Sequence, residues 1–376
     1  MTRPLNIGID IRNLKAAATG QKTYLEELCR ELKLLEDSHC RFFFFDTWIP
    51  VYSGKNKLLK LFEHFNLQCW KQVSLPLKAW SKKTDIIFCI DYFAPYLHLG
   101  YQTVEVFHDA FFYEYPQHYN RIWLKLFKLI AIPAARRSAC IVAPSHYARQ
   151  RIHHYTKIPL EKIVTIYEGP KTLHNRQATA ALPSWLPVHQ HFRYILHVGV
   201  MEKRKNLPAL IRAFKQLRDH GYEQYKLVLV GKGDGKMHSD DTAQIMAAIR
   251  EHQLENVVIT PGYLPDDQLG MVYQHAALYI FPSVNEGFGI PILEAFSYQV
   301  PVLVANNTCL PEIGGPAVLT FDPYDTADMV SKMRMVIDNE ALRTDLIQKG
   351  TERLRQFSWK IAAQELVALF KKLRSS

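Results

Sequence analysis

The sequence predicts an α/β protein made of two doubly wound parallel sheets, and three observations support this. The chain has 376 residues, more than one hydrophobic core usually organises, so about two domains are expected. Short β-branched or aromatic runs alternate with longer helical periodicity, which is typical of parallel sheets wrapped by helices. The alternation stops once, in a polar stretch with three prolines at 169–191, and then resumes, so this stretch is expected to be the linker.

The alternation before this linker predicts a first Rossmann-like domain. The expected strands are 5–11, 42–45, 86–90, 103–107, 140–143 and 163–167, and the expected helices are 20–35, 122–137 and 145–155. We place this domain at residues 1–180.

A second Rossmann-like domain is expected at residues 181–376. Its expected strands are 194–198, 227–230, 257–260, 278–281 and 302–305, and its expected helices are 207–218, 241–251, 266–275, 290–298 and 326–337.

Composition indicates an ordinary globular protein, with 48% hydrophobic and 22% charged residues. The first residues lack the pattern of a cleaved secretory signal, and the longest apolar run, near 126–142, is interrupted by Pro133, Arg136 and Arg137. We therefore expect no transmembrane helix. The six cysteines lie too far apart in the sequence for the close pairs that zinc or redox sites need. These features predict a cytoplasmic protein without a metal site.

The net charge of +10 is concentrated in the N-terminal half. Residues 55–83 contain seven lysines and one acid, interleaved with leucine, phenylalanine and tryptophan, and residues 121–151 contain seven basic residues and no acid. This pattern favours an anionic membrane surface or a phosphate-bearing acceptor, and a location on the cytoplasmic face of a membrane. A solvated helix face is the alternative. Nucleic acid is not an expected partner, because no recognition module is visible.

Three loops that follow strands of the second half have the composition of a phosphate or nucleotide site, because ligands bind beyond the carboxyl ends of parallel strands. The loop 199–206 combines Gly199 with the cations Arg204 and Lys205 just before a helix, which suits a diphosphate, although basic residues are also common on exposed turns. In the loop 231–235, Gly231 would allow a ligand to approach the backbone, as would an ordinary flexible turn. Tyr263 ends a third strand, where a base or ribose could lie.

The fourth loop, 281–295, is the most specific. Glu286 lies on the loop, and Glu294 lies about one turn into the following helix, so the two carboxylates can reach different parts of one ligand. Carboxylates accept hydrogen bonds from sugar hydroxyls, and an acid in an apolar helix start is costly unless it is paired. A local cap or ion pair of Glu294 is the alternative.

These motifs together resemble those of the retaining glycosyltransferases of family 4, which have the GT-B fold. The matching pieces of the second half are His197-Val198-Gly199, Arg204-Lys205-Asn206-Leu207, Leu229-Val230-Gly231, Gly262-Tyr263-Leu264, Glu286-Gly287-Phe288-Gly289, Glu294-Ala295, Pro301-Val302, Leu310-Pro311-Glu312 and Phe321-Asp322-Pro323.

The first half resembles the same family more loosely. Its matching pieces are Asp10 with Arg12, Gly20 with Thr23-Tyr24, Val106-Phe107-His108-Asp109, Ala143-Pro144-Ser145 and Ile166-Tyr167-Glu168-Gly169. The resemblance implies two domains facing a cleft, with a final helix at 358–376 that crosses back to the N-terminal domain. The reduced glycine loop at Gly20 departs from the family pattern.

The resemblance also implies the site residues. Arg204 and Lys205 would neutralise the donor diphosphate, Glu286 would contact the donor sugar, Glu294 would bind the ribose, and His108 would line the sugar site. Catalytic roles would fall to His108, Glu286, Arg204 and Lys205. The full donor set would be Gly199, Arg204, Lys205, Gly231, Tyr263, Glu286, Gly287, Phe288, Gly289, Ile290 and Glu294, and the acceptor set would be Gly20, Thr23, His108 and Asp109.

By the same resemblance, the enzyme would transfer a hexosyl group with retention from a nucleotide-diphosphate sugar to a glycan or lipid-linked saccharide in surface polysaccharide synthesis, without metal or cofactor. GDP-mannose is the first choice of donor and a UDP-sugar the second. Front-face attack and a covalent intermediate both remain open, and no oligomeric state is indicated. The alternatives are a nucleotide-sugar epimerase of the same fold and a non-catalytic protein that binds sugar nucleotides.

Overall fold

The computed structural model describes residues 3–15, 19–52, 54, 56–119, 121–172, 185–186, 193–233, 235 and 239–375. The chain forms two compact units, one of Met1–Gly169 with Ser358–Ser376 and one of Pro170–Phe357. Most of the expected linker at 169–191 lies outside the described residues, as does Asp234 of the expected glycine loop.

The first unit is built on a six-stranded parallel sheet in the order β2-β1-β3-β4-β5-β6. Its strands are β1 (Leu5–Asp10), β2 (Cys40–Phe45), β3 (Ile86–Cys89), β4 (Gln102–Val106), β5 (Cys140–Ala143) and β6 (Ile163–Thr165). Strands β3 and β5 are buried at every residue, as expected where helices cover both faces of a parallel sheet. The strand order reverses between β1 and β3, which is where such sheets bind ligands.

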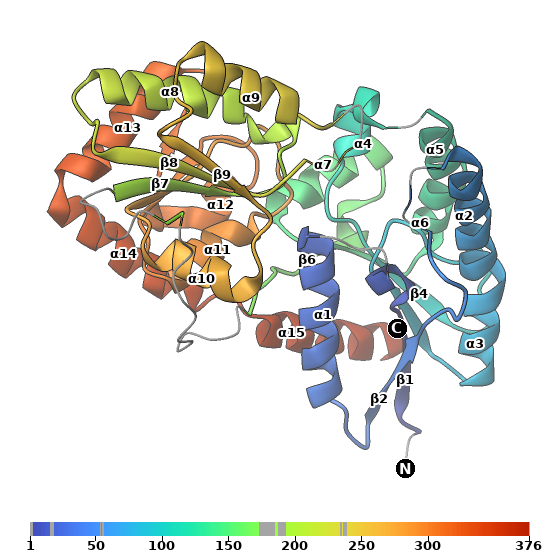
Figure 1. The fold of residues 1–376 in the computed structure, drawn as a ribbon. Coiled ribbons are helices and arrows are strands. Elements are labelled where there is room, and N and C mark those ends of the chain that lie inside the picture. The colour runs from blue at the N-terminus through green and yellow to red at the C-terminus, as the bar shows by residue number, and fades with distance from the viewer. Residues whose placement is uncertain are drawn as a thin grey trace. The chain divides into compact units, whose positions relative to one another are not determined.

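The helices of the first unit cover both faces of this sheet (Figure 1). They are α1 (Thr19–Leu34), α2 (Lys57–Cys69), α3 (Leu75–Ser81), α4 (Phe111–Glu114), α5 (Arg121–Leu126), α6 (Ile132–Arg137), α7 (His146–Thr156) and α15 (Trp359–Ser375). On β3, Phe88 packs against Phe370 of α15 with ring centroids 5.5 Å apart. The alternate residues Ile87 and Cys89 pack in a cluster with Leu75 of α3.

The predicted return of the final helix to the N-terminal domain is confirmed. Helix α15 packs against α1, where the rings of Tyr24 and Trp359 meet edge to face at 5.3 Å. Near its end, Arg374 donates a hydrogen bond of 2.8 Å to the carbonyl of Arg3.

Two π-helical turns interrupt the helices of the first unit, η2 (Trp70–Ser74) and η4 (Phe127–Ala131). Each is followed by a proline at the start of the next helix, Pro76 in α3 and Pro133 in α6. Proline lacks an N–H group, and its ring clashes with the carbonyl four residues earlier, so a wider turn relieves the conflict. The helix expected at 122–137 is therefore divided into α5, η4 and α6.

The turn η2 places the side chain of Lys71 in the interior of the first unit. Lys71 is 1% exposed, its Nζ lies 2.6 Å from Asp10 Oδ2, and it also donates to Asp91. Trp70 Nε1 donates to Asp10 Oδ1 at 3.0 Å. These contacts connect α2 and α3 to the carboxyl ends of β1 and β3.

The second unit contains another six-stranded parallel sheet, in the order β12-β11-β10-β7-β8-β9. Its strands are β7 (Arg193–Val198), β8 (Tyr225–Val230), β9 (Val258–Gly262), β10 (Leu278–Phe281), β11 (Val302–Ala305) and β12 (Val318–Phe321). This is the Rossmann order, which reverses between β7 and β10.

The helices of the second unit lie on both sides of its sheet, with α8 and α9 on one side and α10 and α11 on the other (Figure 1). They are α8 (Leu207–Asp219), α9 (Thr242–Glu251), α10 (Asp266–Gln274), α11 (Ile290–Ser297), α12 (Leu310–Gly314), α13 (Thr326–Asp338) and α14 (Glu340–Leu354). Side-chain caps begin the last two: Asp325 accepts from Ala327 N at 2.8 Å, and Asn339 accepts from Leu342 N at 2.9 Å.

The predicted fold class, two doubly wound α/β sheets, is confirmed. The sequence did not predict the edge strand β12 or the helices α2, α3, α4, α12 and α14. Within the described ranges, no helix has both the length and the hydropathy that crossing a bilayer requires.

Candidate active site

The sheet order of the second unit brings two of the predicted loops together. Strands β7 and β10 are neighbours, and the order reverses between them, so a crevice is expected beyond their carboxyl ends. The cation loop follows β7, and the loop of Glu286 follows β10. At this point Val284 N donates to the carbonyl of Arg204 at 2.8 Å, which fixes the two loops to each other.

A short 3-10 turn, η6 (Lys203–Lys205), presents the cations just before α8. The turn ends at Asn206, which adopts the left-handed conformation with φ 56°. This conformation is unusual for a residue other than glycine. The Asn206 side chain donates to the carbonyl of Pro323 at 2.8 Å and so holds the turn.

The side chains of Arg204, Lys205 and Glu286 form one cluster, in which Lys205 and Glu286 are buried and Arg204 is partly exposed. Lys205 Nζ lies 2.6 Å from Glu286 Oε1, and Arg204 Nη1 lies 2.8 Å from the same oxygen. Arg204 Nε also donates to Glu202 Oε2 at 2.7 Å. Lys205 and Glu286 are 6% and 7% exposed, so these charges interact in a medium that screens them weakly.

The electrostatic environment keeps Glu286 ionised. Burial opposes ionisation, but Arg204 and Lys205 outweigh it and lower the pKa of Glu286 to about 2. For Lys205, burial and the neighbouring Arg204 lower the pKa, and Glu286 acts in the opposite direction. A carboxylate and two cations are therefore held together at the switch point.

A neutral histidine lies under this cluster. His197 of β7 is fully buried and donates from Nδ1 to the carbonyl of Ile280 on β10 at 3.1 Å. Burial and the charge of Lys205 lower the pKa of His197 to about 3. Its role is therefore to join the two strands that carry the site rather than to add charge.

The predicted glycines Gly199 and Gly231 lie against each other. Gly231 has φ 133°, and a Cβ atom built there would lie 1.9 Å from the carbonyl oxygen of Gly199. A Cβ atom on Gly199 would lie 3.4 Å from Lys205 Cε. Position 231 therefore requires glycine, whereas a Cβ atom at position 199 would only make tight contact with the side chains of His197 and Lys205. Tyr263, at the end of β9, is 65% exposed.

The loop that carries Glu286 runs directly into α11. Gly289 begins this helix with φ 110°, and Pro291 occupies its first turn. Phe288 and Ile290 are buried, while the carbonyls of Glu286 and Phe288 accept from Cys309 Sγ at 3.3 and 3.0 Å. These contacts fix the backbone from Gly287 onward.

Glu294 is buried in α11 but does not join the cation cluster. Tyr273 donates to its Oε2 at 2.7 Å. Burial raises the pKa of Glu294, although the hydrogen bond from Tyr273 and the charge of Lys171 act in the opposite direction. Lys171 pairs with Asp266 at 2.5 Å. Sequence reasoning missed Tyr273, Lys171 and Asp266, because no pattern connects them to Glu294.

The predicted residues of the first unit lie near the carboxyl ends of its strands. His108 follows β4, and Asp109 accepts a hydrogen bond from Phe111 N at 3.1 Å. Thr23 is buried on α1, next to Tyr24, whose ring centroid lies 5.0 Å from that of His108. Gly20, in the first turn of α1, is exposed. Sequence reasoning gave no role to Glu168, whose carboxylate lies 3.7 Å from His108.

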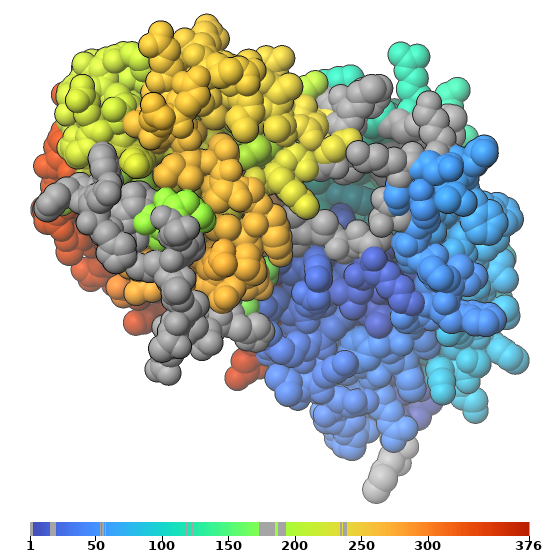
Figure 2. All heavy atoms as spheres, viewed as in Figure 1, coloured from blue at the N-terminus to red at the C-terminus, as the bar shows by residue number. Residues whose placement is uncertain are grey.

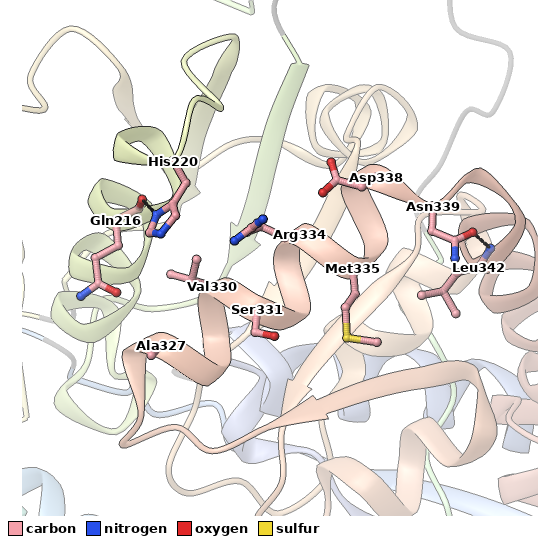
Figure 3. A pocket seen from close by; sticks show the side chains of 10 residues that line it. All are labelled: Gln216, His220, Ala327, Val330, Ser331, Arg334, Met335, Asp338, Asn339 and Leu342. Carbon is pink, nitrogen blue, oxygen red and sulfur yellow. Dashed lines mark hydrogen bonds between the residues drawn. The ribbon is translucent and has the colours of Figure 1, made fainter.

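The second unit also has a surface groove of about 550 Å³ between α8 and α13 (Figure 3). Its lining residues are Gln216, His220, Ala327, Val330, Ser331, Arg334, Met335, Asp338, Asn339 and Leu342. None of these is a predicted site residue, and the groove lies along helices rather than beyond strand ends. We therefore place the candidate site at the β7–β10 switch point instead.

Each half of the chain matches a known family model. Residues 186–353 match the model "Glycosyl transferases group 1", and residues 18–172 match the model "Glycosyltransferase Family 4". The chain belongs to the family 4 glycosyltransferases. It is thus an enzyme of a retaining glycosyltransferase family.

This family 4 glycosyltransferase is similar to curated mannosyltransferases of Escherichia coli. It is 28% identical to O-antigen chain mannosyltransferase B over 277 residues, which are 72% of this chain and 71% of the relative. It is 28% identical to the serotype-specific mannosyltransferase WbdA over 252 residues. That match covers 64% of this chain but only 29% of WbdA.

Solved structures show that the glycosyltransferase has the GT-B fold. Sucrose-phosphate synthase from Thermosynechococcus elongatus superposes with a TM-score of 0.75 at 18% identity, over 99% of both chains. HepE from Anabaena, solved in complex with UDP, superposes with a TM-score of 0.70 at 16% identity, over 98% of this chain and 100% of HepE.

Proposed function

We propose that this glycosyltransferase transfers a hexosyl group, most simply mannosyl, from a nucleotide-diphosphate sugar to a glycan or lipid-linked saccharide in surface polysaccharide synthesis. The observation that carries the proposal is the ion cluster of Arg204, Lys205 and Glu286 at the β7–β10 switch point. The similarity to O-antigen chain mannosyltransferase B supports mannosyl as the transferred sugar, and GDP-mannose is our first choice of donor. The UDP complex of HepE keeps a UDP-sugar as the second choice.

The geometry supports a division of roles between the cations and the carboxylate. A diphosphate brought to Arg204 and Lys205 would compete with Glu286 for the same donors, because both are anions facing the same two cations. The cations would then stabilise the charge that develops on the leaving diphosphate. Glu286, no longer engaged by both cations, would accept hydrogen bonds from the sugar hydroxyls. Glu294 would bind the ribose.

Binding of the donor can be tested with a thermal-shift panel of GDP-mannose, UDP-glucose, dTDP-rhamnose and ADP-glucose. A ligand that binds only the folded protein stabilises it by about 2.7 kcal/mol at one hundred times its dissociation constant. We expect GDP-mannose to raise the melting temperature most, and Lys205→Met to remove most of this effect. Equal or zero shifts with all four donors would contradict the proposed donor site.

Turnover with and without acceptor separates the proposal from its alternatives. A transferase consumes the donor rapidly only when a saccharide acceptor is added. An epimerase converts the donor alone, and a non-catalytic binding protein converts nothing under either condition.

We also propose that an anionic membrane surface is a partner of the first unit, at the cytoplasmic face. The segment of α2, η2 and α3 carries a stripe of solvent-exposed apolar side chains; Figure 2 shows this segment in lighter blue at the right edge. The stripe consists of Leu58, Leu61, Phe62, Phe65, Val73, Leu77 and Trp80, each at least 54% exposed. The exposed charges beside it are lysines, Lys60, Lys78, Lys82 and Lys83.

The position of Glu63, the single acidic residue of the segment 55–83, supports the same proposal. Glu63 points inward, where it pairs with Arg12 and accepts from Tyr52 N at 3.1 Å. The outer face therefore combines apolar area with positive charge, and each cation near an anionic surface contributes roughly 1 kcal/mol.

Co-sedimentation with vesicles tests this partner. We expect binding to phosphatidylglycerol-containing vesicles, little binding to pure phosphatidylcholine, and weaker binding at high salt. Phe62→Ser with Phe65→Ser should reduce binding at least about tenfold, since two buried aromatic side chains contribute several kcal/mol. The matched control is Leu34→Ser with Tyr324→Ser, which removes side chains of 72% and 77% exposure outside the stripe. Equal losses in both double variants would contradict a role of the stripe.

A further inference from the structure

Both ring nitrogens of His108 face oxygen acceptors. Its Nε2 lies 3.3 Å from the carbonyl of Ile90 at the end of β3, and its Nδ1 lies 3.7 Å from Glu168 Oε1. A carbonyl oxygen accepts but cannot donate, and the same holds for an ionised carboxylate. The two neighbours are therefore best satisfied when both ring nitrogens carry protons, which makes the imidazole a cation.

The charges around His108 are predominantly negative. Burial lowers the pKa of His108, but the negative charges of Glu168 and Asp109 outweigh it and raise the pKa. The other titratable groups packed against the ring are the phenols Tyr24 of α1, at 5.0 Å, and Tyr92, at 6.3 Å between ring centroids.

The loop that carries Glu168 is held by the returning C-terminal segment. Glu168 follows β6 and is 5% exposed. The next residue, Gly169, lies so close to Trp359 that a Cβ atom there would be 2.6 Å from the Trp359 backbone nitrogen. The Trp359 ring packs on Tyr24, and Tyr24 packs on His108. The start of α15 thus supports both members of the pair.

We propose that Glu168 is the positioning residue of His108, holding the imidazole as an oriented cation at the carboxyl end of β4. The ring is not sealed off, because 14% of the His108 side chain is exposed. A fixed imidazolium there would attract an anionic oxygen of the substrates, such as a phosphate oxygen, through its positive charge. This inference rests on the proposed function, which supplies substrates with such oxygens.

The decisive variant is Glu168→Gln, which keeps the size of the side chain and removes its charge. Its direct readout is the titration of His108, followed by NMR in protein labelled at histidine, with His108→Asn used for assignment. We expect the pKa of His108 to fall by about one pH unit or more in Glu168→Gln. In Glu168→Asp, which keeps the charge, the pKa of His108 should fall less. The control Glu161→Gln removes an exposed carboxyl before β6 and should leave the titration of His108 unchanged.

The kinetic readout is the pH profile of kcat. An imidazolium is lost as pH rises through its pKa, so the activity of Glu168→Gln should fall at lower pH than that of the wild type. At pH 8 we expect kcat to drop at least about tenfold, with KM for the donor changed far less. A merely structural role would lower activity equally at all pH values and would overturn the proposal.

The two readouts separate this proposal from the proposed function. If no donor is turned over but the titration of His108 shifts as expected, the proposed function fails and the positioning role stands. If transfer is observed and the titration of His108 is the same in the wild type and in both Glu168 variants, the positioning role is wrong. Should Glu168→Gln fail to fold, the comparison of Glu168→Asp with the wild type decides in the same way, because lengthening the gap to the ring must also lower the pKa.

Discussion

Glu286→Gln will bind nucleoside diphosphate at least as tightly as the wild type and yet lose transfer activity by about a hundredfold or more. In the wild type, a diphosphate must compete with Glu286 for Lys205 and Arg204, at 2.6 and 2.8 Å. Glutamine removes that competitor without removing the cations. It also removes the charged acceptor proposed to bind the sugar hydroxyls. The affinity for nucleoside diphosphate and the rate of transfer should therefore change in opposite directions.

Calorimetric titration with GDP and initial-rate measurements with donor and acceptor check this expectation. The melting temperature without added nucleotide should fall, since removing one member of a buried ion cluster costs roughly 3 to 5 kcal/mol. The matched control, Glu255→Gln, changes an exposed carboxyl before β9 and should alter neither quantity. Unchanged transfer, or a loss of diphosphate binding as large as the loss of transfer, would show that Glu286 does not have the proposed role.

Glu105→Gln will make the protein more stable at pH 8 while changing its stability little at pH 4.5. Glu105 of β4 is fully buried, and burial raises its pKa to about 8 from an ordinary value of 4.5. Ser138 donates to Glu105 Oε1, whereas Oε2 has no hydrogen-bond partner in the described part of the chain. Glutamine has the shape of the neutral acid and carries no charge at any pH.

The sign of this pH dependence follows from the pH range in which the folded and the unfolded chain each keep the proton on Glu105. Below about pH 4.5 the carboxyl is protonated in the folded and the unfolded chain. Between 4.5 and about 8 only the folded chain keeps the proton, so the free energy of unfolding falls as pH rises. The difference between these pKa values corresponds to at most roughly 4 to 5 kcal/mol, and this penalty is complete above pH 8.

Urea unfolding of the wild type and Glu105→Gln at several pH values tests the prediction. The quantity to compare is the difference in unfolding free energy between the two proteins. This difference should begin to increase at about pH 4.5 and become constant above pH 8. Glu251→Gln, at the exposed end of α9, is the control for removing one carboxylate. A difference between wild type and Glu105→Gln that is the same at every pH would contradict burial of Glu105 as a neutral acid.

Most of the fold could be predicted from the sequence, because buried parallel strands are encoded locally. Strands such as β5 and β11 are short runs of apolar residues between polar turns, and they occur where the alternation predicted them. Strand β12 was missed because it is only four residues long and two of them are not buried. The helices α2 and α3 were missed because their apolar stripe faces solvent, which local periodicity does not reveal.

The sequence predicted which residues form the candidate site but not which of their side chains pair with each other. The sequence pointed to Arg204, Lys205 and Glu286, yet it assigned the cations to the donor and not to the carboxylate 81 residues away. Their pairing depends on β10 lying beside β7. Glu168 had no assigned role, because its importance comes from the ring of His108 and not from its own neighbours in the chain.

The sequence by itself determined the class of fold, the family and the side chains that carry charge at strand ends, since these depend on local hydrophobic pattern and on motif spacing. The tertiary structure alone decided which charges meet: Glu286 with two cations, Glu168 with His108, and Lys71 with Asp10 and Asp91. The physical reason is that electrostatic pairing depends on distance in space and on burial. Both quantities are set by the order of strands in a sheet and by the packing of helices on it.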